Sequence, residues 1–146
     1  MRFLGFKRKP SAIHAPNVRN FFVALANVAS PAGRGDYAFA KSDGSRLGYA
    51  QFIIESYTRV TIHRLWTRNS GAGAGSAILR TLCGLADTHA VELTLKTIPF
   101  GRKPYPLNTD QLAGWYSRYG FQKTGKYMTR KPRTAIDPQA SGQNPD

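Results

Sequence analysis

Apolar residues recur at steps of three and four over residues 17–29, the spacing that keeps side chains on one side of an α-helix. The residues on this stripe are Val18, Phe21, Phe22, Leu25 and Val28. Ser30-Pro31 follows, and a proline disfavours the helical conformation in the residue before it. The pattern therefore predicts an amphipathic helix that ends before Ser30.

Three stretches rich in β-branched and aromatic residues come next, at 36–40, 47–57 and 59–67. Lys41-Ser-Asp-Gly-Ser45 joins the first two, and its Asp43-Gly44 pair is typical of a tight hairpin turn. We therefore expect two antiparallel strands followed by a third.

A glycine-rich segment, Gly71-Ala-Gly-Ala-Gly75, connects the third strand to a second helical pattern that ends near His89. The stripe of this helix consists of Ile78, Leu79, Leu82, Leu85 and Ala86. Residues 91–97 then alternate apolar and polar positions, as a strand does. A helix that crosses between two strands of one sheet leaves them parallel. The segment predicts a β–loop–α–β unit.

The last part of the chain predicts a short helix and two short strands. After a proline-rich loop, Asn108 or Thr109 starts a helix that runs to Tyr119, with Gln111 placed to complete a capping box on Asn108. The strands follow at 121–123 and 126–130. The whole order predicts an α/β chain, with a mixed, mostly antiparallel sheet and helices on both sides.

The 146 residues fit one domain, which we place over 1–136 with a compact N-terminal region 1–35 and a core 36–130. Residues 137–146 hold no large apolar side chain and predict a disordered tail. The formal charge is +13, which favours an acidic partner or substrate. No apolar run reaches the ~18 residues of a membrane span, and no signal peptide is recognisable, so we expect a cytoplasmic protein.

Cys83 is the only cysteine, which excludes a disulfide within the chain. With three histidines beside it no cysteine-rich zinc site can form, and we expect no metal. Cys83 lies on the apolar stripe of its helix, so we interpret it as buried packing rather than a nucleophile.

The glycine-rich segment leaves the amides around 70–76 unobstructed at a helix N-terminus, where a phosphate group binds well. Close packing of the helix on the strand is the other interpretation. A Walker loop is excluded because Ser76-Ala77 follows the last glycine where Lys-Ser/Thr is needed. The dinucleotide fingerprint also fails, because its third glycine would be Ser76 or Ile78.

Ser70-Gly-Ala-Gly-Ala-Gly-Ser-Ala-Ile-Leu79 resembles the pyrophosphate loop of the Gcn5-related N-acetyltransferase (GNAT) superfamily, with serine in place of the first Arg or Gln. A second register, beginning at Arg68, keeps the arginine but misplaces the aliphatic pair. Leu112-Ala-Gly-Trp-Tyr-Ser-Arg-Tyr-Gly-Phe121 resembles a second signature of the same superfamily. The resemblance covers about 36–130, and Asp87 together with the Met128-x-Arg130-x-Pro132 ending looks like small bacteriophage members.

The resemblance implies direct attack of an amine on acetyl-CoA in a ternary complex, without a covalent enzyme intermediate or a metal. The implied cofactor-binding residues are Leu65, Trp66 and Thr67, whose backbone would pair with pantetheine, and Ser70, Gly71, Ala72, Gly73, Ala74, Gly75 and Ser76. Tyr116 matches the tyrosine that protonates the departing thiolate. Packing between helix and sheet is the alternative role for Tyr116.

The acceptor and the general base stay open. Glu55 and His63 are the nearby titratable candidates, and Arg68, Arg102, Lys103 and Arg118 could meet the 3′-phosphate of CoA. We expect a protein or small-molecule amine as acceptor. The basic charge also allows a transferase acting on aminoacyl-tRNA or DNA, or a non-catalytic module that binds CoA or nucleic acid. A steep fall of affinity with salt would distinguish a nucleic-acid binder.

Overall fold

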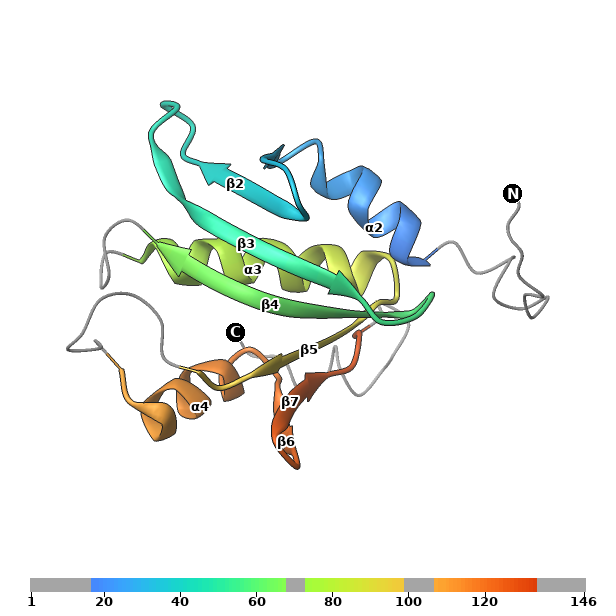
Figure 1. Cartoon of the computed structure of the whole chain (residues 1–146), viewed down its shortest axis with the longest axis vertical. Coiled ribbons are helices and arrows are strands. Elements are labelled where there is room, and N and C mark those ends of the chain that lie inside the picture. The colour runs from blue at the N-terminus through green and yellow to red at the C-terminus, as the bar shows by residue number, and fades with distance from the viewer. Residues whose placement is uncertain (1–16, 68–72, 99–106, 134–146) are drawn as a thin grey trace.

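The computed structural model describes residues 17–67, 73–98 and 107–133. Their helices are α2 (Asn17–Leu25), α3 (Ala74–Thr88) and α4 (Thr109–Ser117). Their strands are β1 (Ser30–Pro31), β2 (Asp36–Ala40), β3 (Arg46–Ile54), β4 (Arg59–Thr67), β5 (Glu92–Lys96), β6 (Gln122–Thr124) and β7 (Tyr127–Arg130). Every predicted element is present (Figure 1), and β1 is an addition. The predicted tail at 137–146 lies outside the described residues.

The strands form one sheet in the order β1-β2-β3-β4-β5-β7-β6. Every neighbouring pair is antiparallel except β4 and β5, which are parallel. Helix α3 makes the crossover between these two strands. The predicted mixed, mostly antiparallel sheet is therefore confirmed.

Helices α2 and α3 share one face of the sheet and contact each other. Phe21 of α2 packs edge-on against Phe52 of β3, with ring centroids 6.3 Å apart. On the same face, a Cβ built on Gly48 would lie 3.2 Å from Cδ1 of Ile78 in α3. The sequence predicted helices on both sides of the sheet but assigned no helix to a face, because an apolar stripe shows that a helix is packed and not on which face.

Helix α2 is shorter than predicted and ends at Leu25 rather than at residue 29. The backbone forms tighter 3₁₀-type turns there, since the amides of Asn27 and Val28 bond to carbonyls three residues back. Val28 is left 51% exposed, so the last apolar residue of the predicted stripe does not pack. Leu25, by contrast, is fully buried.

The core lies between this face of the sheet and α3. Apolar side chains of α3, β4 and β5 supply much of it: Ile78, Leu79, Leu82, Ala86, Val60, Ile62, Leu65, Leu93 and Leu95. Each fully buried Leu or Ile contributes about 1.5–3 kcal/mol relative to an exposed one. The helix and the parallel strand pair are thus held together at the centre of the molecule.

Candidate functional site

Strand β4 separates from β5 halfway along its length. The last pair between them is Ile62 with Leu95, whereas β4 continues to Thr67 and stays paired with β3 as far as Gly48. Residues 63–67 therefore have one edge that no described strand occupies. The predicted separation of Leu65, Trp66 and Thr67 from the following strand is present. No described strand bonds their outward backbone groups, which therefore suit a ligand that pairs as a strand does.

A β-bulge marks the point of separation. Gln51 pairs with Arg64 and Phe52 with Ile62, so His63 is the extra residue on β4. His63 and Arg64 are both exposed, whereas Ile62 and Leu65 are both buried. A bulge bends its strand and increases the local twist. It accounts for the departure of β4 from β5 at this position.

The N-terminus of α3 lies just beyond the free end of β4. Gly73 is the N-cap residue with a φ of +81°, a left-handed conformation suited to glycine. The first amide that bonds back within the helix is that of Ala77, to the Gly73 carbonyl at 3.0 Å. The amides of Ala74, Gly75 and Ser76 thus form no helical hydrogen bond.

The helix starts earlier than the sequence indicated. The sequence places all of 71–75 before the helix, but Ala74 and Gly75 form its first turn. Ile78 and Leu79 are both fully buried, as the register beginning at Ser70 requires. The remaining predicted loop residues, Ser70, Gly71 and Ala72, lie outside the described residues.

Helix α4 supplies Tyr116. The helix begins with the predicted capping box, in which the Asn108 side chain accepts from the Gln111 amide at 2.8 Å and the Gln111 side chain accepts from the Asn108 amide at 2.9 Å. Tyr116 is only 3% exposed, and its ring contacts Trp115 and Phe121 with centroids 5.0 and 5.6 Å apart. Burial raises the pKa of Tyr116 above its ordinary value, which keeps the phenol protonated.

Trp115 joins α4 to the first turn of α3. Its Nε1 donates a 3.4 Å hydrogen bond to Oγ of Ser76. A Cβ on Gly75 would lie 3.3 Å from the Trp115 ring and 3.8 Å from Cγ2 of Thr67. The end of β4, the start of α3 and the helix that carries Tyr116 therefore meet at Gly75.

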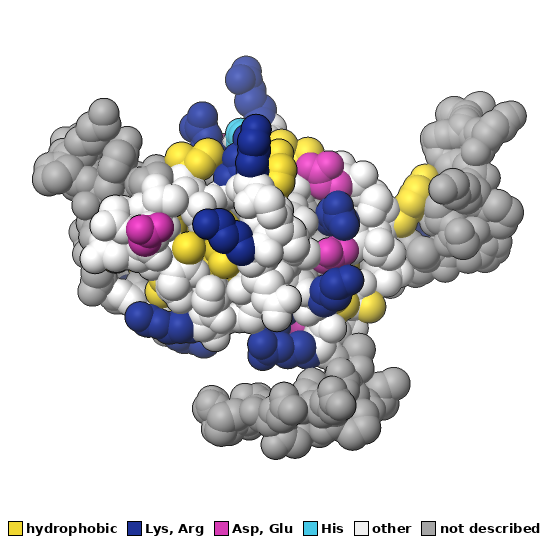
Figure 2. All heavy atoms as spheres, turned by 90° about the horizontal axis from the view of Figure 1, so that it is seen from below, with side chains coloured by type: hydrophobic (Ala, Val, Ile, Leu, Met, Phe, Trp, Pro, Cys, Tyr) yellow, Lys and Arg dark blue, Asp and Glu magenta, His cyan; other side chains and the backbone are white. Residues whose placement is uncertain are grey.

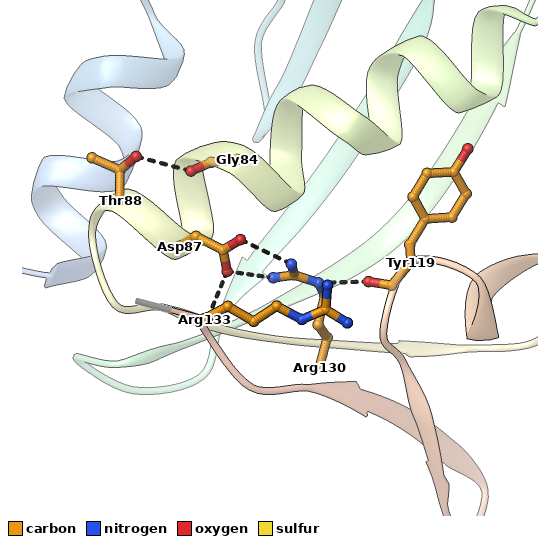
Figure 3. A network of polar contacts seen from close by, with 6 residues as sticks. All are labelled: Gly84, Asp87, Thr88, Tyr119, Arg130 and Arg133. Carbon is orange, nitrogen blue, oxygen red and sulfur yellow. Dashed lines mark hydrogen bonds and ion pairs between the residues drawn. The ribbon is translucent and has the colours of Figure 1, made fainter. Parts of the chain in front are cut away.

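An ion pair that the sequence did not assign fixes the end of α4 (Figure 3). Asp87 of α3 accepts from both terminal nitrogens of Arg130, at 2.8 and 3.0 Å, and from the backbone amide of Arg133 at 2.7 Å. Arg130 is 3% exposed, and its Nε donates to the Tyr119 carbonyl at 2.7 Å. At Gly120, φ is +96° and a Cβ would lie 2.5 Å from Nη2 of Arg133. The glycine of the second signature thus makes room for this network.

The remaining residues that the sequence singled out differ in their exposure and contacts. His63 is exposed at the bulge, and Glu55 accepts a 2.8 Å hydrogen bond from the Thr61 hydroxyl. Cys83 is buried, and desolvation raises the pKa of its thiol to about 11, so it is a poor nucleophile. Arg118 is the C-cap residue of α4 and is exposed. Arg68, Arg102 and Lys103 lie outside the described residues.

Residues 17–67, 73–98 and 107–133 hold neither a metal-binding cluster nor a helix able to cross a membrane. In these three ranges, no three or more His, Cys, Asp or Glu side chains are grouped so as to hold a metal ion. No helix within them has the length and apolar character needed to cross a membrane.

Comparison with known proteins finds no matching family model and no matching curated protein. Solved structures do match. Ard1 from Thermoplasma volcanium is 18% identical over 77% of this chain and 78% of its own, with a TM-score of 0.50. A GNAT family acetyltransferase from Elizabethkingia anophelis, solved with acetyl-CoA bound, is 14% identical over 88% of this chain and 94% of its own, with a TM-score of 0.50.

The anti-CRISPR protein AcrVA5 is 20% identical over 65% of this chain and 97% of its own, with a TM-score of 0.49. The resemblance to bacteriophage members stays a prediction. Identities this low establish the fold only. The chain has the fold of the GNAT superfamily.

Proposed function

We propose that the chain is an N-acetyltransferase that moves an acetyl group from acetyl-CoA directly to a primary amine. The observation that carries this proposal is the meeting of Thr67, Gly75 and Trp115, because it brings together three parts that such a reaction needs. These are a free strand edge, a free helix N-terminus and a buried phenol. The acetyl-CoA bound to the neighbour from E. anophelis supports the same co-substrate here.

Acetyl-CoA would be held mainly by backbone groups. The free amides of Ala74, Gly75 and Ser76 point from the positive end of α3 and suit the pyrophosphate. The free edge of Leu65, Trp66 and Thr67 would pair with the amides of pantetheine, as a strand would. Such backbone contacts tolerate the serine at position 70, which supplies no positive charge.

In the reaction, the nitrogen of the neutral amine attacks the thioester carbonyl carbon, a C–N bond forms and the C–S bond breaks. The nitrogen releases its proton to solvent. Tyr116 gives its proton to the departing sulfur and regains one from solvent. Among the described residues, no hydrogen-bond partner occupies its hydroxyl, which leaves that group free for the sulfur.

Calorimetry with acetyl-CoA on the intact chain tests the binding step, and labelled acetyl-CoA with a fractionated lysate tests transfer. We expect binding, followed by label in an amine-containing fraction. Binding without transfer to protein, RNA, DNA or small molecules would identify a non-catalytic module instead. Absence of any binding heat or thermal shift would contradict the proposal altogether.

A further inference from the structure

Three side chains form a stack on the sheet face away from α3. Tyr49 of β3 and Trp66 of β4 are directly paired, with ring centroids 5.2 Å apart and planes at 19°. The Arg46 guanidinium lies 5.1 Å from the centre of the Tyr49 ring and donates to its hydroxyl. Because Gly48 faces Ile78 of α3, the adjacent Tyr49 must face the other way.

Only one side of the Trp66 ring is occupied by this stack. Tyr49 covers the side toward β3, and no other described aromatic ring or cation contacts the indole. Trp66 is partly exposed and lies beyond the bulge, where β4 has lost its pairing with β5. The second side of the indole thus lies away from β3, toward the free strand edge, and we infer that it can take a planar ligand.

Two cations without acidic partners among the described residues lie on the same face of the sheet as this indole. Arg64, two residues away on the same strand, is exposed and forms no ion pair with a described residue. Lys96 of β5 is also exposed and lies 5.4 Å from the centre of the Tyr127 ring. Glu92, an acid on the same face, is paired with Arg59 at the far end of β4.

The sheet face away from α3 faces the reader in Figure 1 and lies along the upper edge of the molecule in Figure 2. Lys and Arg side chains project there around a histidine, with hydrophobic side chains beside them. We call this surface the aromatic–cationic face and define it as Arg46, Tyr49, Arg64, Trp66, Lys96 and Tyr127.

We propose that the aromatic–cationic face binds single-stranded nucleic acid, with a base stacked on Trp66 and phosphates on Arg46, Arg64 and Lys96. Unpaired bases offer planar rings, and the backbone offers regularly spaced negative charges. The bases of a duplex are already stacked on each other, so a duplex would use the charges alone. An acidic protein segment would also leave the open side of Trp66 unused. The overall charge of +13 agrees with an anionic polymer as the ligand.

The test measures fluorescence anisotropy of a labelled oligothymidylate and an oligouridylate with the full chain, without acetyl-CoA, over a salt series. Arg64→Glu should weaken binding by about tenfold or more, because an attractive phosphate contact becomes repulsive. The matched control is Arg80→Glu, an exposed arginine on α3 with no part in this face. It should change the dissociation constant by less than about twofold.

A second variant tests stacking. Trp66→Ala should weaken binding on the order of tenfold, and Trp66→Phe should restore much of it, because a phenyl ring still offers a stacking surface. Thermal melts must show that both variants fold. Only nucleic-acid binding is measured for them, since the backbone of Trp66 also belongs to the proposed acetyl-CoA site.

Three results would overturn the proposal. Equal losses in Arg64→Glu and Arg80→Glu would show that overall charge alone attracts the polymer. Equal competition by duplex DNA would exclude stacking, and equal competition by polyglutamate would assign the face to acidic proteins. Because no step uses acetyl-CoA, a failure to bind acetyl-CoA would leave this result unaffected.

Discussion

Gly75 of α3 and Trp115 of α4 lie so close together that a Cβ on the glycine would come within 3.3 Å of the indole. The sequence predicts that glycine at this position leaves the neighbouring amides unobstructed for the pyrophosphate. The structure adds a second reason, since Gly75 also lets α4 approach the start of α3. A substitution here should therefore affect both the packing of α4 and the binding of acetyl-CoA.

Gly75→Ala should lower the affinity for acetyl-CoA and give no gain in stability. The matched control is Gly84→Ala in the same helix, where nothing lies within 4 Å of an added Cβ. That control should gain roughly 0.5–1 kcal/mol, as alanine does over glycine inside a helix. Calorimetry and denaturant titration measure the two effects. Similar behaviour of the two variants would mean that the contact with Trp115 has no consequence.

Tyr116→Phe should keep the fold and the acetyl-CoA affinity but lower kcat by ~10²–10⁴-fold, if the phenol protonates the departing thiolate. The ring contacts with Trp115 and Phe121 survive this change, so packing is preserved. A thioester with a more acidic leaving thiol should reduce the loss. With chemistry rate-limiting, a variant faster than about a third of the parent would remove Tyr116 from the mechanism.

The free energy of unfolding should depend on pH through the ionisation of the buried Cys83 thiol. Burial raises the pKa of Cys83 from 9.0 to about 11 in the folded chain, so folding favours the neutral form. Its contribution to stability is fully present below pH 9 and is lost as the pH rises through about 11. In denaturant titrations, Cys83→Ala should lack this loss. Parallel curves for the two proteins from pH 8.5 to 11 would contradict the raised pKa.

Asp87→Ala should destabilise the chain by about 3–5 kcal/mol, because it leaves the buried Arg130 guanidinium without its counter-charge. Glu92→Gln is the comparison, since it breaks the ion pair with Arg59, whose side chain is 49% exposed. That change should cost less than about 1 kcal/mol. Denaturant unfolding of both variants provides the test, and equal costs would refute the distinction between the two pairs.

The sequence predicted most elements because their apolar spacing is regular, and it failed where spacing carries no information. In β4 the buried residues are Val60, Ile62 and Leu65, so the step changes from two to three at the bulge. That irregular step was the available signal for His63 as the extra residue. Strand β1 has only two residues and one is Pro31, so it has no pattern to detect.

The candidate site was predicted in part for a similar reason. The glycine loop and Tyr116 belong to contiguous motifs, which can be recognised in one chain. The Asp87–Arg130 pair joins residues 43 positions apart, and nothing local indicates which charges will meet after folding. The face chosen by α2 is likewise a property of tertiary packing.

The network at Asp87 also bears on how the protein opens locally. One carboxylate holds Arg130 of β7 and the amide of Arg133, and through Arg130 it holds the carbonyl of Tyr119 after α4. These segments cannot separate from α3 one at a time without leaving a buried charge unpaired. The end of α4 and strand β7 should therefore behave as one cooperative unit, whose amides exchange with deuterated solvent at a common rate.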